Sequence, residues 1–115
     1  MEYNTVGGTL AKARSSATLK ATVKVYTVPA DADFATITIR CTNIGPTTGY
    51  VNVWIGDNPT APTDLDYLEF ETSLSKGGHV ENTCVVVSPG DTIYISSDLS
   101  TVITRVYGLL RKTVQ

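Results

Sequence analysis

The chain has 115 residues, a formal net charge of −2 and 42% hydrophobic residues, which fits one soluble domain with one core. Its few lysines and arginines are scattered along the sequence, so we expect no basic face for nucleic acid. No apolar run approaches the roughly 18 residues of a membrane span, and the first four residues lack the start of a signal peptide, so we expect a cytoplasmic origin and no membrane contact.

Residues 1–16 come first, and we interpret them as an N-terminal arm. They contain Gly7-Gly8 and small polar residues, with little to anchor a core. Such an arm stays loose or becomes ordered against a neighbouring subunit, and a short helix over 9–14 is only weakly signalled. The sequence thus predicts an arm over 1–16 and a single domain over 17–115.

Alternating apolar and polar residues predict the strands of that domain. The clearest alternation runs from Phe34 to Asn43, where every second residue is apolar, as on a strand with one buried face. We expect the other strands at 17–28, 50–55, 64–72, 79–87, 92–97 and 101–110. In the strand over 64–72 we expect Leu68 and Phe70 to face inward and Glu69 and Glu71 to face outward. Val85 to Val87 are apolar on both faces, as in a central or interface strand.

Glycine and proline separate these strands. The Ser88-Pro-Gly-Asp91 run predicts a tight turn, and the proline-rich stretch 56–63 predicts the longest loop. Seven strands at this spacing, with room for an eighth, indicate an all-β antiparallel sandwich with an N-terminal arm. A jelly roll and an immunoglobulin-like Greek key both fit.

Residues with catalytic chemistry are few. His79 has no sequence partner for a metal pair or a triad, so we interpret it as a turn residue. Cys41 and Cys84 fall in predicted strands, and we expect free, reduced and buried thiols rather than a bridge. Acidic residues between Asp57 and Glu71 could in principle bind calcium, but we favour a solvated acidic edge. We therefore expect no catalytic residues, no metal and no cofactor.

Aromatic residues on the outward parity of the strands are the more informative feature. If Val51, Val53 and Ile55 face the core, then the aromatic side chains between them face away from it. Aromatic side chains on rigid strands are typical of protein interfaces and also of sugar-binding platforms. We favour the interface over the sugar platform here. The interface residues that we predict are Tyr26, Tyr50, Trp54 and Tyr94 from the strands, with Val6 and Leu10 from the arm.

Several blocks in fixed order resemble small virion proteins of tailed bacteriophages. They are residues 25–30 (VYTVPA), the alternating run to Asn43-Ile-Gly45, residues 67–74 (YLEFETSL), residues 87–93 (VSPGDTI) and a last strand ending near Gly108. The resemblance covers about residues 25–110. It implies a β-sandwich component of the particle, of which similar proteins are capsid decoration or cement subunits, commonly trimers.

From this resemblance we expect a phage structural protein rather than an enzyme, most of all a homotrimeric capsid decoration protein. Its partners would be its own copies and the major capsid protein or other virion proteins, and its location the virion, after assembly in the host cytoplasm. A tail, neck, baseplate or fibre module of the virion would use the same sandwich. A carbohydrate-binding module would use Trp54 and Tyr50 as its platform.

Overall fold

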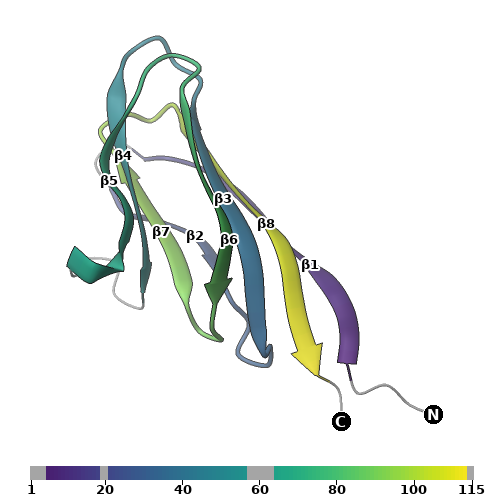
Figure 1. The fold of residues 1–115 in the computed structure, drawn as a ribbon. Coiled ribbons are helices and arrows are strands. Elements are labelled where there is room, and N and C mark those ends of the chain that lie inside the picture. The colour runs from purple at the N-terminus through teal and green to yellow at the C-terminus, as the bar shows by residue number, and fades with distance from the viewer. Residues whose placement is uncertain (1–4, 19–20, 57–63, 114–115) are drawn as a thin grey trace.

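The computed structural model describes residues 5–18, 21–56 and 64–113, with only the backbone of residues 5–12, 64 and 113. Eight strands form two four-stranded antiparallel sheets, which confirms the predicted all-β sandwich (Figure 1). Sheet A has the order β1 (Thr5–Ser16), β8 (Val102–Thr113), β3 (Phe34–Asn43) and β6 (His79–Val87). Sheet B has the order β2 (Val23–Thr27), β7 (Thr92–Ser97), β4 (Gly49–Gly56) and β5 (Tyr67–Leu74), and the short 3₁₀ helix η1 (Asp64–Asp66) precedes β5.

The connections between the strands make this sandwich a jelly roll. The strands pair as β1 with β8, β2 with β7, β3 with β6 and β4 with β5, which is one long antiparallel ribbon folded over. Along the chain, every connection except that from β4 to β5 passes from one sheet to the other. Of the two topologies left open by the sequence, the jelly roll is therefore the observed one.

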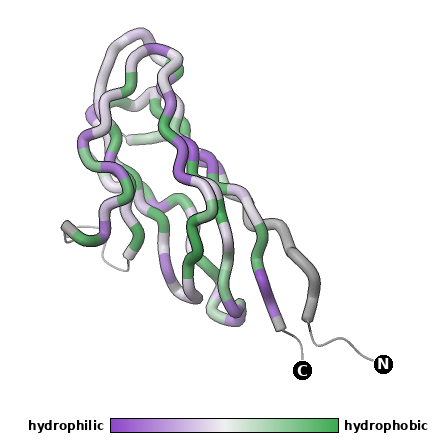
Figure 2. Tube along the Cα trace, viewed as in Figure 1, coloured by the Kyte–Doolittle hydropathy of each residue, from purple (hydrophilic) through white to green (hydrophobic). Residues whose placement is uncertain are grey.

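The core lies between the two sheets and follows the alternation of the sequence. Figure 2 shows hydrophobic and hydrophilic residues alternating along the strands of both sheets. Each inward residue of β3 from Ala35 to Cys41 is at most 1% exposed. The facing sheet supplies Val51, Val53, Ile93 and Ile95, each fully buried. Burying a side chain of this size contributes roughly 1.5–3 kcal/mol, so these rows hold the sheets together.

The inner strands pair without interruption, whereas the edge strands do not. The ladders β3–β8 and β4–β7 keep one register from end to end. In contrast, β1, β2, β5 and β6 each show a register shift against their inner neighbour. Two of these bulges place a residue other than glycine at positive φ, namely Glu71 at 48° and Cys84 at 54°. Bulges on edge strands twist the unpaired backbone groups and hinder strand addition by another chain.

Asn43 joins several loops at one end of the sandwich. It is fully buried, and its Nδ2 donates to the carbonyl oxygens of Thr47 at 2.8 Å and Leu74 at 3.1 Å. Its Oδ1 accepts from the Gly45 N–H at 3.0 Å and from Thr101 Oγ1 at 2.8 Å. One amide therefore links the end of β3 to the β3–β4 turn, the end of β5 and the β7–β8 loop.

Several expectations from the sequence are corrected by the structure. Residues 5–16, expected as an arm, form the edge strand β1 on β8, and residues 9–14 are strand rather than helix. The second strand begins at Val23, and β6 lies at the edge of its sheet rather than in the centre. Phe70, expected to be inward, is 61% exposed, because the bulge in β5 at residues 70 and 71 reverses the parity.

Glu69 is also placed differently from the prediction. It pairs with the core residue Val53, and its carboxylate accepts from Thr72 Oγ1 at 2.7 Å and from Asn82 Nδ2 at 3.2 Å. Asn82 belongs to β6 of the other sheet. Glu69 therefore faces the interior and bridges the two sheets at the β5–β6 edge.

We predict that Asn43→Asp strongly destabilises the fold. The new carboxylate oxygen would face the two carbonyl oxygens that now accept from Nδ2, so the variant should lose about 3–5 kcal/mol at pH 7. Part of the loss should be recovered at acidic pH, where the buried carboxyl is protonated and can donate again. Urea unfolding at pH 7 and pH 4 measures both effects.

Thr48→Asp is the control, because Thr48 is exposed in the same turn. The substitution adds the same negative charge as Asn43→Asp, but at a position where the charge stays in water. It should change the unfolding free energy by less than about 0.5 kcal/mol. Equal changes in the unfolding free energy of the two variants would show that the hydrogen bonds of the Asn43 amide do not stabilise these loops.

Candidate interaction surface

The outer face of sheet A exposes large apolar side chains at one end. Thr36 of β3 pairs with Val86 of β6 on one side and with Leu109 of β8 on the other. Val86 is 67% exposed and Leu109 is 54% exposed, and Phe34 and Tyr107 are exposed on the same face. We call Phe34, Val86, Tyr107 and Leu109 the apolar face. Clustered exposed apolar residues mark interaction sites more often than isolated ones do.

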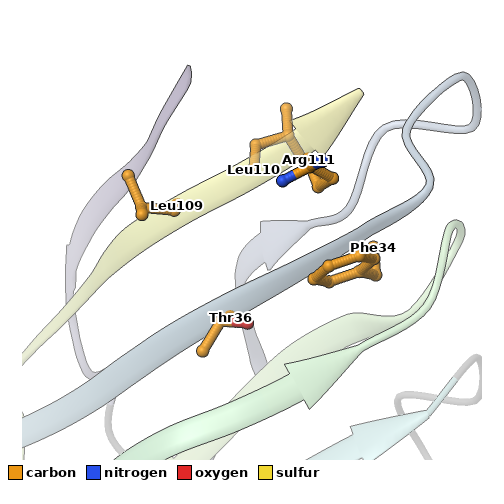
Figure 3. Close-up of a pocket in the computed structure, with 5 residues that line it drawn as sticks. All are labelled: Phe34, Thr36, Leu109, Leu110 and Arg111. Carbon is orange, nitrogen blue, oxygen red and sulfur yellow. The ribbon is translucent and has the colours of Figure 1, made fainter. Parts of the chain in front are cut away.

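A shallow hollow lies within this region, between β3 and β8. Figure 3 shows Phe34 and Thr36 on β3 and residues Leu109 to Arg111 on β8, which line the hollow. The Arg111 position pairs with Phe34, so a charged group borders the aromatic ring. The mostly apolar lining of the hollow suits a single apolar side chain of a partner.

Three arginines form a row across the same face. Arg14 of β1 lies opposite Arg105 of β8, which lies opposite Arg40 of β3. Directly opposed residues on one face have Cβ atoms about 5 Å apart, so the three positive charges repel one another. We call these three residues the arginine row.

At the β6 end of the arginine row, a single carboxylate compensates part of the charge. Glu81 pairs with Arg40, and its Oε2 lies 3.4 Å from Arg40 Nη1. The same oxygen accepts from Tyr107 Oη at 3.3 Å. Among the described residues, Arg14 and Arg105 have no such carboxylate partner, so the face is positively charged on a chain of net negative charge.

The aromatic residues predicted as interface residues lie on sheet B, and two of them are not exposed. Trp54 and Tyr94 do face away from the core, but they stack with ring centroids 5.6 Å apart and are only 3% and 6% exposed. Tyr67 packs against Trp54 on the other side, with centroids at 5.8 Å. The expectation that Trp54 and Tyr94 are exposed on the wet face of the sheet is therefore wrong, and the sugar platform expected on Trp54 and Tyr50 has its Trp54 ring buried.

None of the other predicted interface residues has a side chain that the structure shows fully exposed. Tyr26 packs against the core because a bulge in β2 after Lys24 changes its parity, and burial raises its pKa. Tyr50 is half-buried and uses its backbone to bind Asp98 and Ser97. Val6 and Leu10 lie in β1 opposite Lys112 and Leu109, and their side chains are outside the described residues. Their roles at an interface stay predictions.

The two cysteines are free, as expected, but differ in exposure. Cys41 is buried, with its Sγ 3.4 Å from Thr104 Oγ1, and burial raises its pKa to about 11. Cys84 is exposed, contrary to the prediction, because the bulge in β6 holds it at positive φ. His79 is exposed at the first position of β6.

No group of three or more metal-binding side chains occurs among the described residues. Asp57 of the acidic segment lies outside them. In the part of the chain that the structure describes, no helix is long and apolar enough to span a bilayer.

We predict that Arg105→Glu stabilises the isolated chain. The substitution turns the two repulsive pairs of residue 105 with Arg14 and Arg40 into attractive pairs. Each such cross-strand pair contributes roughly 0.2–1 kcal/mol to the free energy of unfolding. The gain should appear in urea unfolding at low salt and shrink at 1 M salt, where charges are screened. Arg111→Glu, whose β3 neighbour is Phe34, should give no comparable gain. A stability of Arg105→Glu at or below that of the wild type would contradict repulsion in the arginine row.

We predict that Cys41 makes the stability fall at alkaline pH. Below pH 9, the ordinary pKa of the thiol, it is neutral in both states and its full contribution is present. Between pH 9 and its folded pKa of about 11, only the unfolded thiol ionises, so stability drops by up to about 1.4 kcal/mol per pH unit. Cys41→Ala should lack this component of the slope in urea unfolding from pH 8 to 11, and Cys84→Ala should keep it. Identical slopes for Cys41→Ala and wild type would argue against the raised pKa.

Comparisons with known proteins bear on the fold. No family model matches the chain, and no curated protein matches it in sequence. A solved structure from work entitled "Bacillus endospore appendages form a novel family of disulfide-linked pili" is similar, with a TM-score of 0.60 and 13% identity. The match covers 100% of this chain and 93% of that one, so the whole jelly roll is shared rather than one sheet. At this identity the likeness concerns the fold alone.

Proposed function

We propose that the chain is a structural subunit, not an enzyme, and that it works by assembly through the outer face of sheet A. The apolar face is the observation that carries the proposal. Val86 and Leu109 expose more than half of their surface on the two positions that flank Thr36 in a rigid sheet. Burying such residues against a partner removes them from water and requires little ordering of the backbone.

The edges of the sheets favour contact through a face rather than strand addition. All four edge strands carry a register shift, and strand addition requires a regular row of free backbone groups. The central strands of sheet A, in contrast, present side chains in one unbroken register. A partner that docks on side chains finds a fixed pattern there.

The particle that we propose is a phage virion, with this chain as a capsid decoration protein. The resemblance of the ordered sequence blocks over residues 25–110 to small virion proteins supports this proposal. That resemblance implies a homotrimer bound to the major capsid protein. A cement protein stabilises a shell by burying surface across several subunits, for which an exposed apolar face is suited. The similar solved structure belongs to a pilus, which is also an assembled structure.

A tail, neck, baseplate or fibre module of the virion is the second candidate. It would use the same surface, and the pilus fold supports an elongated assembly as much as a shell. Copy number separates the two, because a decoration protein covers the whole shell, whereas a tail or neck module sits at only a few sites of the particle. Densitometry of purified virions and a density map of the particle measure this number and the position.

We predict that the purified chain forms oligomers and that Leu109→Ser weakens them at least about tenfold. The loss of one exposed leucine that becomes buried at the centre of an interface is on the order of 1.4 kcal/mol or more, which is a factor of ten. Light scattering coupled to size exclusion, over a range of protein concentrations, measures the dissociation constant.

Ile44→Ser is the matched control. Ile44 is 66% exposed, but it follows β3 at the end remote from Phe34. It should leave the dissociation constant unchanged. A wild-type chain that stays monomeric at all concentrations and is absent from purified particles would refute the assembly role.

A further inference from the structure

We propose that copies of this chain join head to tail, with the β5 edge of one copy docked on the outer face of sheet A of the next. This proposal rests on the assembly role proposed above and names the partner and the two surfaces. It follows from a separation of charge within the chain, which gives each copy one acidic and one basic surface, both with exposed apolar residues.

The acidic surface lies on η1 and β5. Residues 41–75 contain five acidic residues and no lysine or arginine, and of these five Glu69 faces the interior, as described above. Within the described part of this segment, Leu65 is 95% exposed, Phe70 is 61% exposed, and Glu71 is exposed beside them. We call Leu65, Phe70 and Glu71 the acidic edge.

The backbone holds the acidic edge in a defined shape. The N–H of Glu71 donates to Asn52 Oδ1 at 2.7 Å, which fixes the bulge in β5. The ring of Phe70 packs edge-on against Tyr67, with centroids 5.0 Å apart. Both side chains are thus presented outward at little cost in conformational entropy, as expected of a surface that binds a partner.

The outer face of sheet A has the complementary chemistry. Arg105 of the arginine row lies on β8, two positions from Tyr107 and four from Leu109. Positive charge and apolar surface therefore adjoin on this face too. The row places like charges on directly opposed positions, which reduces the stability of the isolated chain. A carboxylate from a second copy would relieve this repulsion in the complex.

The two surfaces belong to different sheets. The acidic edge lies on η1 and on β5, an edge strand of sheet B, whereas the arginine row crosses β1, β8 and β3 of sheet A (Figure 1). A contact between unlike patches is heterologous, so it closes into a ring if the rotation permits and otherwise grows into a filament. Both a trimer and a fibre can follow from the same contact.

Other occupants fit the observations less well. Two copies that met face to face would bring their arginine rows together, which adds repulsion rather than removing it. A polyanion such as nucleic acid would leave the exposed apolar residues beside this row, Tyr107 and Leu109, without a contact. A second copy provides both the carboxylate and the apolar side chains.

The test uses one variant for each surface. The face variant is Arg105→Glu, and the edge variant is Leu65→Ser/Glu71→Gln, in which all substituted residues are exposed. Each variant alone should show a dissociation constant at least tenfold above that of the wild type. Lys24→Glu, the same charge reversal on an exposed residue of β2, should assemble like the wild type. The melting temperature of the face variant should not fall, so lost assembly cannot be attributed to unfolding.

Mixing the two variants is the decisive arm. The intact edge of the face variant can dock on the intact face of the edge variant, so the mixture should form a 1:1 dimer that cannot extend. Light scattering or mass photometry of the mixture detects it, and its affinity should fall with added salt.

Three outcomes would overturn the proposal while the wild type still assembles. They are an edge variant that assembles normally, a face variant that assembles normally, and a mixture that forms no dimer. If the face variant assembles normally, binding of a DNA oligonucleotide by the wild type would assign the arginine row to a polyanion instead. A wild-type chain that does not assemble at all would instead refute the assembly role itself, and the head-to-tail contact with it.

Discussion

The two inner ladders, β3 on β8 and β4 on β7, are the constraint on which the rest of the structure depends. They keep one register throughout, and the side chains that they send inward make up most of the core. The edge strands are added to these ladders with bulges that their inner neighbours do not have. The jelly roll thus combines a regular centre, which fixes the positions of side chains, with irregular edges, which discourage unwanted pairing.

The same register determines what the molecule presents to a partner. Because Ile37 and Ile39 must face the core, Thr36 and Arg40 must face outward, and their cross-strand neighbours Leu109 and Arg105 follow them. A fold selected for stability alone would place opposite charges and polar residues at these positions. The chain instead keeps repulsive arginines and exposed apolar residues on its most rigid sheet, which is expected where stability is traded for binding.

The sequence predicted the sandwich well and its surfaces poorly, for identifiable reasons. Strands β3, β6 and β7 were predicted with their observed ends, because their alternation or turn residues are local signals. The edge strand β1 was missed, since residues 5–16 become a strand only through pairing with residues 103–113. Bulges reversed the parity of Tyr26 and Phe70, and a bulge conformation exposed Cys84. The arginine row joins residues 14, 40 and 105, which no local pattern connects.

The distribution of polar and charged groups in this molecule is consistent with the assembly role that we propose. The buried Asn43 and the partly buried Glu69 each bind several neighbours and connect loops or sheets, so their hydrogen-bonding capacity is used within the chain. Arg14 and Arg105 of the arginine row, in contrast, have no carboxylate partner among the described residues, and in the contact that we propose the acidic edge of the next copy supplies one. If each copy satisfies the next, the number of copies in the assembly depends on the rotation between neighbours rather than on further contacts. A closed ring on a capsid and an open fibre would then differ by a small change in docking angle, with the same residues at the interface.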